Sequence, residues 1–155
     1  MKFWSGLAIA AAATLLSACN ADMNFNTSSS GVPLAELDYK GAKPTEIALA
    51  GPDNLIVTSG DSLSIEVEGD PEITKDLRFD LDEDSLEIGR EGNWRNSGVA
   101  TIRITMPTPN EVTVAGSGTI EVDRLGTGGD AEVSIAGSGE SAIARVDAAE
   151  LEVNV

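Results

Sequence analysis

Short stretches of alternating apolar and polar residues run along the chain after residue 46. They are residues 47–49 (IAL), 63–67 (LSIEV), 77–81 (LRFDL) and 102–106 (IRITM), each rich in β-branched or large apolar side chains. Gly, Asp, Asn or Pro flanks these stretches, as is usual for half-buried strands. After the N-terminal segment, no stretch keeps helical spacing over three turns. The pattern therefore predicts an all-β fold.

The most informative feature is an internal repeat. Residues 112–118 (VTVAGSG) recur 21 positions later as residues 133–139 (VSIAGSG), and a third copy begins at residues 151–155 (LEVNV). The third copy comes one residue early, and this difference falls in a turn, where stacked coils tolerate a change of length. One repeat cannot bury both faces of its strands, whereas stacked repeats share a continuous narrow core.

These repeats predict a parallel β-helix, or β-solenoid, with coils of about 20 residues. The half before Gly98 is less regular, and we expect antiparallel pairs there; an antiparallel β-sandwich of hairpins is the alternative. Stacking would align Val112, Val133 and Val153 in one ladder, and Val114, Ile135 and Val155 in the next. Structural turns that allow positive φ and close packing are expected at Gly116, Gly118, Gly137 and Gly139.

The N-terminus has the pattern of an export signal. Lys2 precedes an uncharged apolar run from Gly6 to Leu16, which is too short to span a bilayer. Residues 16–19 (LSAC) resemble the lipobox of bacterial lipoproteins, which implies a signal peptide at residues 1–18 and acyl chains, such as palmitate, on Cys19. The alternatives are an ordinary secretory signal cut after Ala18 with a free thiol, or a core cysteine; Cys19 is the only cysteine of the chain.

Composition indicates how the rest of the chain is organised and which partners its charge disfavours. Residues 19–33 are polar and rich in Ser and Asn, which predicts a flexible tether before a domain at residues 34–155. From Cys19 onward the chain has all 26 acidic residues and nine of the ten basic ones, a net charge near −17. This charge argues against nucleic acid as a partner and against a domain that lies flat on anionic lipid. It indicates either a solvated surface or, more specifically, cation binding.

Two features near the ends of the chain bear on the membrane location and on the completeness of the domain. Asn20 follows the cysteine where aspartate would indicate retention in the inner membrane, so we expect the outer membrane of a Gram-negative bacterium. The last repeat stops at Val155 without a polar cap, and we expect the domain to be C-terminally incomplete; the alternative is that another subunit covers this end.

The domain resembles the head GIN domain family, labelled putative autotransporter adhesin. The residues that carry the resemblance are 104–107 (ITMP), 112–122 (VTVAGSGTIEV) and 133–139. The chain departs from the family pattern by alanine at positions 115 and 136, where serine is common, and by Pro109-Asn110. The resemblance implies a β-solenoid fold, a setting in the cell envelope and a role in adhesion.

Four acidic residues have the spacing of a calcium loop. Asp80, Asp82 and Asp84 alternate as the first, third and fifth ligands do, and Glu91 holds the twelfth place. Ser85 stands where such loops require glycine, and both flanking stretches have strand patterns. Bound Ca²⁺ is the one cofactor that the sequence suggests, and a solvated acidic turn is the alternative.

A Gly- and Asn-rich stretch at residues 91–98 contains Trp94 and Arg95. An exposed tryptophan beside a guanidinium can stack on a sugar ring or anchor a partner protein. The alternative is a tryptophan that folds back over the core.

The chain lacks the usual catalytic equipment. The Gly-Ser-Gly turns have neither the lysine and helix of a phosphate-binding loop nor the pattern of a nucleophile elbow, and the chain has no histidine. We therefore expect a non-catalytic envelope lipoprotein for adhesion, scaffolding or binding to an envelope protein or glycan. The rival hypothesis is a polysaccharide lyase or hydrolase of the parallel β-helix type, which requires an exposed cleft with three or more carboxylates or calcium ligands.

Overall fold

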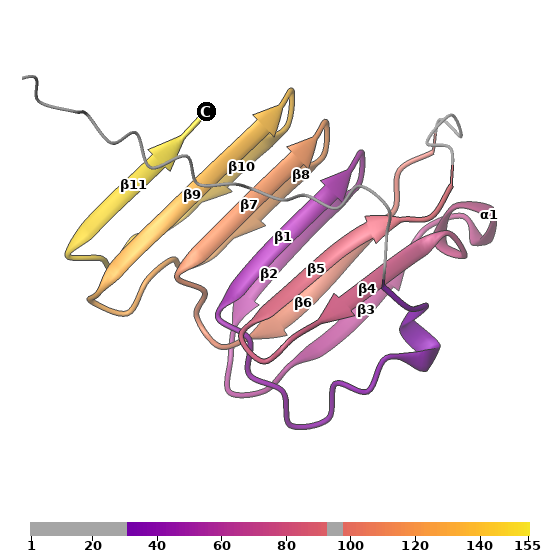
Figure 1. Ribbon diagram of the computed structural model, residues 1–155, viewed down its shortest axis with the longest axis horizontal. Coiled ribbons are helices and arrows are strands. Elements are labelled where there is room, and N and C mark those ends of the chain that lie inside the picture. Colours follow the sequence, from indigo (N-terminus) through magenta and orange to yellow (C-terminus); the bar gives the residue numbers. More distant parts are fainter. Residues whose placement is uncertain (1–30, 93–97) are drawn as a thin grey trace, which may run out of the picture.

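The computed structural model describes residues 31–92 and 98–155, and these fold into two layered β-sheets (Figure 1). The all-β prediction is confirmed. Sheet A has the order β11 (Glu150–Asn154), β9 (Asp130–Gly137), β7 (Glu111–Gly116), β1 (Glu46–Gly51), β5 (Ser85–Arg90) and β4 (Leu77–Leu81). Sheet B has the order β10 (Glu140–Ile143), β8 (Thr119–Val122), β2 (Asn54–Ser59), β6 (Thr101–Met106) and β3 (Ser64–Glu68).

The described helices are short. The 3₁₀ turn η1 covers Leu34–Glu36, and α1 covers Pro71–Thr74 between β3 and β4. The carboxylate of Asp70 caps α1 by accepting the backbone N–H of Glu72 at 2.9 Å. Neither helix is long and apolar enough to cross a membrane.

Most neighbouring strands are parallel and in register. In sheet A, Val112 lies opposite Val133, which lies opposite Val153, so the first predicted ladder is confirmed. In the second ladder Val114 lies opposite Ile135, and β11 ends one residue before Val155. The antiparallel pairs are β3 with β6 and β4 with β5. The alternative of an antiparallel sandwich is therefore wrong for the domain as a whole, because the strands of the repeat stack in parallel.

The core lies between the two sheets. Inward side chains of sheet A, such as Leu49 and Val114, meet those of sheet B, such as Leu55 and Ile120, and all four are fully buried. Phe79 of β4 closes the core at one end. At the other end Leu151 and Val153 of β11 are about half exposed. Because side chains alternate along each strand, the inward residues of neighbouring strands form apolar rows that line the core.

The repeat begins earlier than the sequence suggests. The strands β1 and β2 form a coil in which Gly51-Pro52-Asp53 takes the place of Gly-Ser-Gly, and Gly51 lies opposite Gly116. This coil lies between the β5–β6 coil and the β7–β8 coil, so the first two strands in the sequence lie inside the stack, and later strands are added on both sides of them. The order of coils in space therefore differs from their order in the sequence.

The turn glycines allow successive coils to pack closely. Gly116 and Gly137 have φ of 111° and 112°, in the left-handed region. A Cβ atom on Gly118 would lie 2.6 Å from the carbonyl oxygen of Asp53 and 2.8 Å from that of Gly51. The side chain of Val114 blocks the corresponding space at Gly139. Each turn thus contacts the backbone or core of the coil before it.

We expect Gly118→Ala to destabilise the domain by about 1–3 kcal/mol, because the added methyl group overlaps backbone that cannot move without opening the stack. Thermal unfolding followed by circular dichroism measures the change. The matched control is Gly129→Ala, where a Cβ would meet nothing within 4 Å. Equal unfolding temperatures for the two variants would contradict the close packing of the turns.

Candidate functional site

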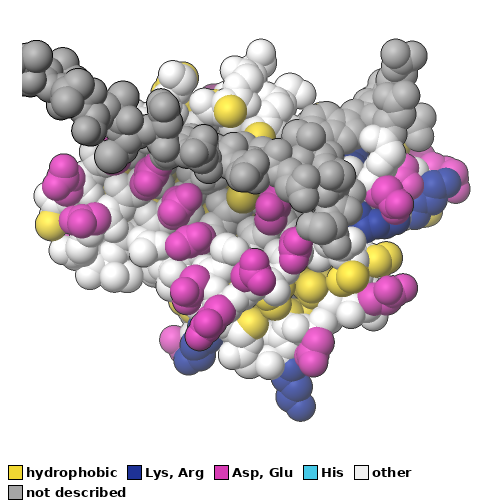
Figure 2. All heavy atoms as spheres, viewed as in Figure 1, with side chains coloured by type: hydrophobic (Ala, Val, Ile, Leu, Met, Phe, Trp, Pro, Cys, Tyr) yellow, Lys and Arg dark blue, Asp and Glu magenta, His cyan; other side chains and the backbone are white. Residues whose placement is uncertain are grey.

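The outer face of sheet A carries a column of glutamates. Glu46 of β1 lies opposite Glu111 of β7, which lies opposite Glu132 of β9, and Glu132 lies opposite Glu152 of β11. These four residues, here called the acidic column, point away from the core because the apolar residue that follows each one in the sequence points toward it. Adjacent strands are about 4.8 Å apart, so the carboxylates have close neighbours of like charge. Acidic side chains gather over this face in Figure 2.

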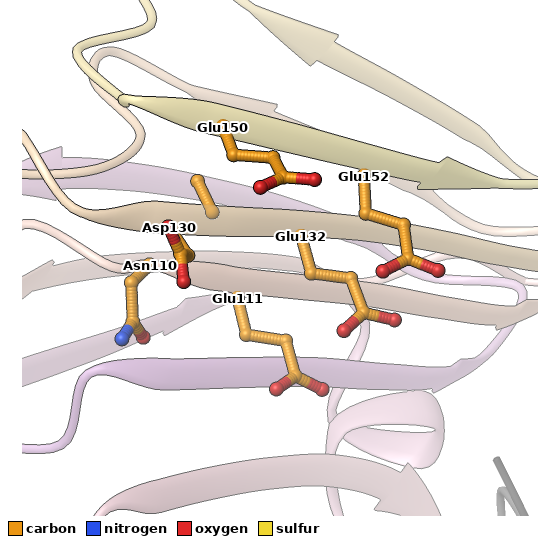
Figure 3. Close-up of a pocket in the computed structure, with 7 residues that line it drawn as sticks. Asn110, Glu111, Asp130, Glu132, Glu150 and Glu152 are labelled. Atoms are coloured by element: carbon orange, nitrogen blue, oxygen red, sulfur yellow. The ribbon is translucent and has the colours of Figure 1, made fainter. Parts of the chain in front are cut away.

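A hollow of about 330 Å³ lies beside the column. In Figure 3 the side chains of Glu111, Glu132 and Glu152 stand side by side, and their carboxylates point the same way. No lysine or arginine is among the residues that line the hollow, which are Asn110, Glu111, Asp130, Ala131, Glu132, Glu150 and Glu152. The site is therefore a concentration of negative charge without an internal counter-ion.

Burial and like charge affect the acidity of this face. Partial burial raises the pKa of the Glu111 carboxyl, and the neighbouring charges of Glu46 and Glu132 raise it further. On β5, burial raises the pKa of Glu87, with Asp80 on the neighbouring strand as the second cause. The ionised column is thus electrostatically unfavourable in the isolated domain, and a cationic group placed on it would relieve this repulsion.

Hydrogen bonds fix one member of the column. The carboxylate of Glu132 accepts from Ser134 Oγ at 3.0 Å and from Asn154 Nδ2 at 3.1 Å. These contacts hold the carboxylate over β9 and β11. In the described part of the chain, no group of three or more Asp, Glu, Cys or His residues has the arrangement of a metal site.

The predicted calcium ligands are not brought together, so this prediction is corrected. Asp80 lies within β4, and Asp82 and Asp84 lie in the tight turn between β4 and β5. Glu91 follows β5 at the opposite end of the hairpin, where it forms an ion pair with Arg78. Residues 77–81 and 85–90 pair as antiparallel strands, and this pairing separates the two ends of the expected loop.

Of the remaining predicted site residues, some lie within the described part of the chain and some outside it. Cys19, Trp94 and Arg95 lie outside the described residues. The four predicted turn glycines lie at the β7–β8 and β9–β10 corners. The acidic column was not predicted, although the repeat contains a signal for it: a glutamate directly precedes the first apolar residue in the strands at residues 46–47, 111–112 and 132–133.

The sequence of the domain matches one known family. Residues 43–155 match the family described as "Putative auto-transporter adhesin, head GIN domain". The chain belongs to this family. The predicted resemblance is thereby confirmed, and the family's name supports a cell-envelope setting and a role other than catalysis. None of the curated proteins matches the chain.

Two solved structures are similar to this GIN domain chain. A "putative lipid binding protein" from Parabacteroides distasonis is 18% identical with a TM-score of 0.50, and the match covers 64% of this chain and 45% of that protein. The chain thus spans less than half the length of that relative. A "putative cell adhesion protein" from Clostridium sporogenes is 12% identical with a TM-score of 0.35, over 76% of this chain and 94% of that one. At such identities, the first match supports the fold alone.

Removal of one charge from the acidic column should stabilise the fold at neutral pH. The pKa of Glu111 is raised on folding, so its favourable contribution is present below the usual carboxyl pKa and is lost as the pH rises through the raised value. We expect Glu111→Gln to increase the free energy of unfolding by about 0.5 kcal/mol at pH 7, the scale of a like-charge cross-strand pair. The gain should be smaller at pH 4.

Chemical denaturation at the two pH values measures this effect. The control is Glu121→Gln on the outer face of sheet B, where the residues opposite are Ile56 and Ala142. An equal gain from the control at pH 7 would mean that net charge, and not the column, is responsible.

Proposed function

We propose that this GIN domain chain is a non-catalytic lipoprotein that presents a β-solenoid at the cell envelope for adhesion, scaffolding or partner binding. The acidic column is the observation that carries this proposal, because it is a row of like charges, partly exposed at Glu46, Glu111 and Glu132 and exposed at Glu152, that a cationic partner would neutralise. An envelope protein with exposed Lys or Arg, or a glycan with amino groups, has the matching chemistry. Anionic lipid does not.

The parallel, in-register stacking of β1, β7, β9 and β11 supports the description as a β-solenoid. Solenoids expose long regular faces and are widely used for binding extended partners. The outer face of sheet A is such a face, since side chains of equivalent repeat positions form straight rows across it.

The N-terminal pattern supports placement by a lipid anchor, in the outer membrane of a Gram-negative bacterium. Acyl chains on Cys19 would hold the domain through the tether at residues 19–33. The end of this segment is fixed to sheet A, because Val32 exchanges backbone hydrogen bonds of 2.9 and 2.8 Å with Phe79 of β4. β4 is at the opposite edge of sheet A from β11. The acidic column therefore extends away from the attachment point.

A glycoside hydrolase is the second candidate function. The hollow beside the column contains five carboxylates, so it meets the requirement for an exposed acidic cleft. Glycoside hydrolysis uses a pair of carboxyl groups, and here Glu111, whose pKa is raised, lies opposite Glu132 on the next strand. A lyase for acidic polysaccharides fits poorly, because the lining has no cation to neutralise the substrate.

Release of reducing ends from neutral polysaccharides distinguishes the two candidates. The binding proposal expects no release by the purified full-length chain. Release that is abolished in both Glu111→Gln and Glu132→Gln would overturn the non-catalytic assignment.

We expect Cys19→Ala to abolish incorporation of an alkyne-labelled palmitate and to move the protein from the membrane fraction to the soluble fraction. The thiol is the acceptor of the acyl chains, so no other residue can replace it. Ser28→Ala in the tether is the control and should keep both label and location. Labelling that persists in Cys19→Ala would refute the anchor.

We expect the amount of envelope partner cross-linked to the protein in intact cells to fall at least tenfold in the quadruple variant E46Q/E111Q/E132Q/E152Q. Formaldehyde cross-linking followed by quantitative mass spectrometry measures the loss. The charge-matched control changes Glu36, Glu83, Glu121 and Glu140, which are exposed and lie away from the column. Retention of partners by both variants, or equal loss from both, would contradict a binding role for this face.

A further inference from the structure

A buried ion pair joins the middle coil to its neighbour. Asp53 is 1% exposed and Arg90 is 5% exposed. Arg90 Nε donates to Asp53 Oδ2 at 2.7 Å, and Arg90 Nη2 donates to Asp53 Oδ1. Each side chain also forms a further hydrogen bond. Arg90 Nη2 donates to the carbonyl oxygen of Gly98 at 3.0 Å, and Asp53 Oδ1 accepts the backbone N–H of Ala100 at 2.7 Å.

These contacts meet where the chain changes sheets. Arg90 is the last residue of β5 in sheet A, and β6 of sheet B begins at Thr101. The connection between them, residues 91–100, is here called the crossing. Asp53 belongs to a different coil, in the turn between β1 and β2. The pair therefore ties that turn to the start of the crossing through Arg90 and to its end through Gly98 and Ala100.

The stacking register explains why an aspartate can occupy this turn. Gly51, Gly116 and Gly137 are in register, and so are Asn54, Thr119 and Glu140 three residues later. Asp53 therefore corresponds to Gly118 and Gly139. In the later coils a side chain here would overlap the preceding turn or core. The coil that precedes β1–β2 in the stack is β5–β6, whose connection is the crossing instead of a Gly-Ser-Gly turn. Because this neighbour has no Gly-Ser-Gly turn, the carboxylate of Asp53 can lie against Arg90 and Ala100 of the β5–β6 coil.

We propose that the Asp53–Arg90 pair is a clamp that fixes where the crossing joins the coil stack. A buried ion pair adds little net stability compared with apolar residues of similar size, because desolvation offsets the attraction. Its hydrogen bonds are directional, however, and here they hold Arg90, before the crossing, and Gly98 and Ala100, at its end, against the same carboxylate and guanidinium pair. The clamp is thus a conformational device that joins the β5–β6 coil, at the described ends of its long connection, to the coil of β1 and β2.

Hydrogen exchange of the Ala100 amide in Arg90→Lys tests the clamp. Lysine keeps the charge next to Asp53 but cannot reproduce the planar, multiple donation of arginine. We expect the Ala100 amide, whose acceptor on Asp53 is still present, to exchange at least tenfold faster, while amides in β7 and β9 keep their rates. Arg103→Lys on the surface of β6 is the control and should change neither. Unchanged exchange at Ala100 would overturn the proposal, as would equal acceleration in all strands.

The double variant D53L/R90M separates positioning from stability. We expect its unfolding temperature to stay within a few degrees of the parent, while the amides of residues 98–101 exchange faster than in Arg103→Lys. A double variant with full protection at residues 98–101 would overturn the clamp. So would one whose protection falls by the same factor throughout the described strands.

Discussion

The structure depends on the in-register stacking of one coil on the next. Equivalent residues meet across parallel strands, so each position of the repeat becomes a row that crosses the sheet. Inside, these rows are apolar and form the core that a single coil could not provide. Outside, the same rule places glutamates beside glutamates. The acidic column is therefore a direct result of the repeat, and its electrostatic repulsion is tolerated because the core rows hold the strands in register.

The stacking also determines what each corner of a coil can contain. Where one regular coil follows another, the turn needs glycine, since the preceding backbone fills the space of a Cβ. Where the neighbouring coil has residues 91–100 in place of a Gly-Ser-Gly turn, this position can hold a larger residue, and Asp53 bonds Arg90. The same repeat position is thus a closely packed glycine in two coils, at Gly118 and Gly139, and an ion-paired aspartate, Asp53, in a third. One geometric rule accounts for both residue types.

Much of the fold could be predicted because the repeat encodes it locally. The match of residues 112–118 with 133–139 correctly aligned Val112 with Val133 and extended to Val153. The β1–β2 coil was missed because Gly51-Pro52-Asp53 hides the signature and because the coils are not stacked in sequence order. The calcium prediction failed because carboxylate spacing was considered without strand pairing, which places Glu91 and Asp82 at opposite ends of a hairpin. The acidic column was missed because the repeat was aligned on its apolar residues and glycines, whereas the signal was the glutamate that precedes the valine in residues 111–112 and 132–133.

The central claim is that the outer face of sheet A is the binding face of an envelope-anchored domain. The most direct test places a photo-cross-linking amino acid at Ala136 on this face or at Ala142 on the outer face of sheet B; both positions are exposed alanines on successive strands. After irradiation of living cells, we expect a covalent adduct of the full-length protein at Ala136 and none at Ala142. Adducts at Ala142 alone, or at neither position, would contradict the assignment of the binding face.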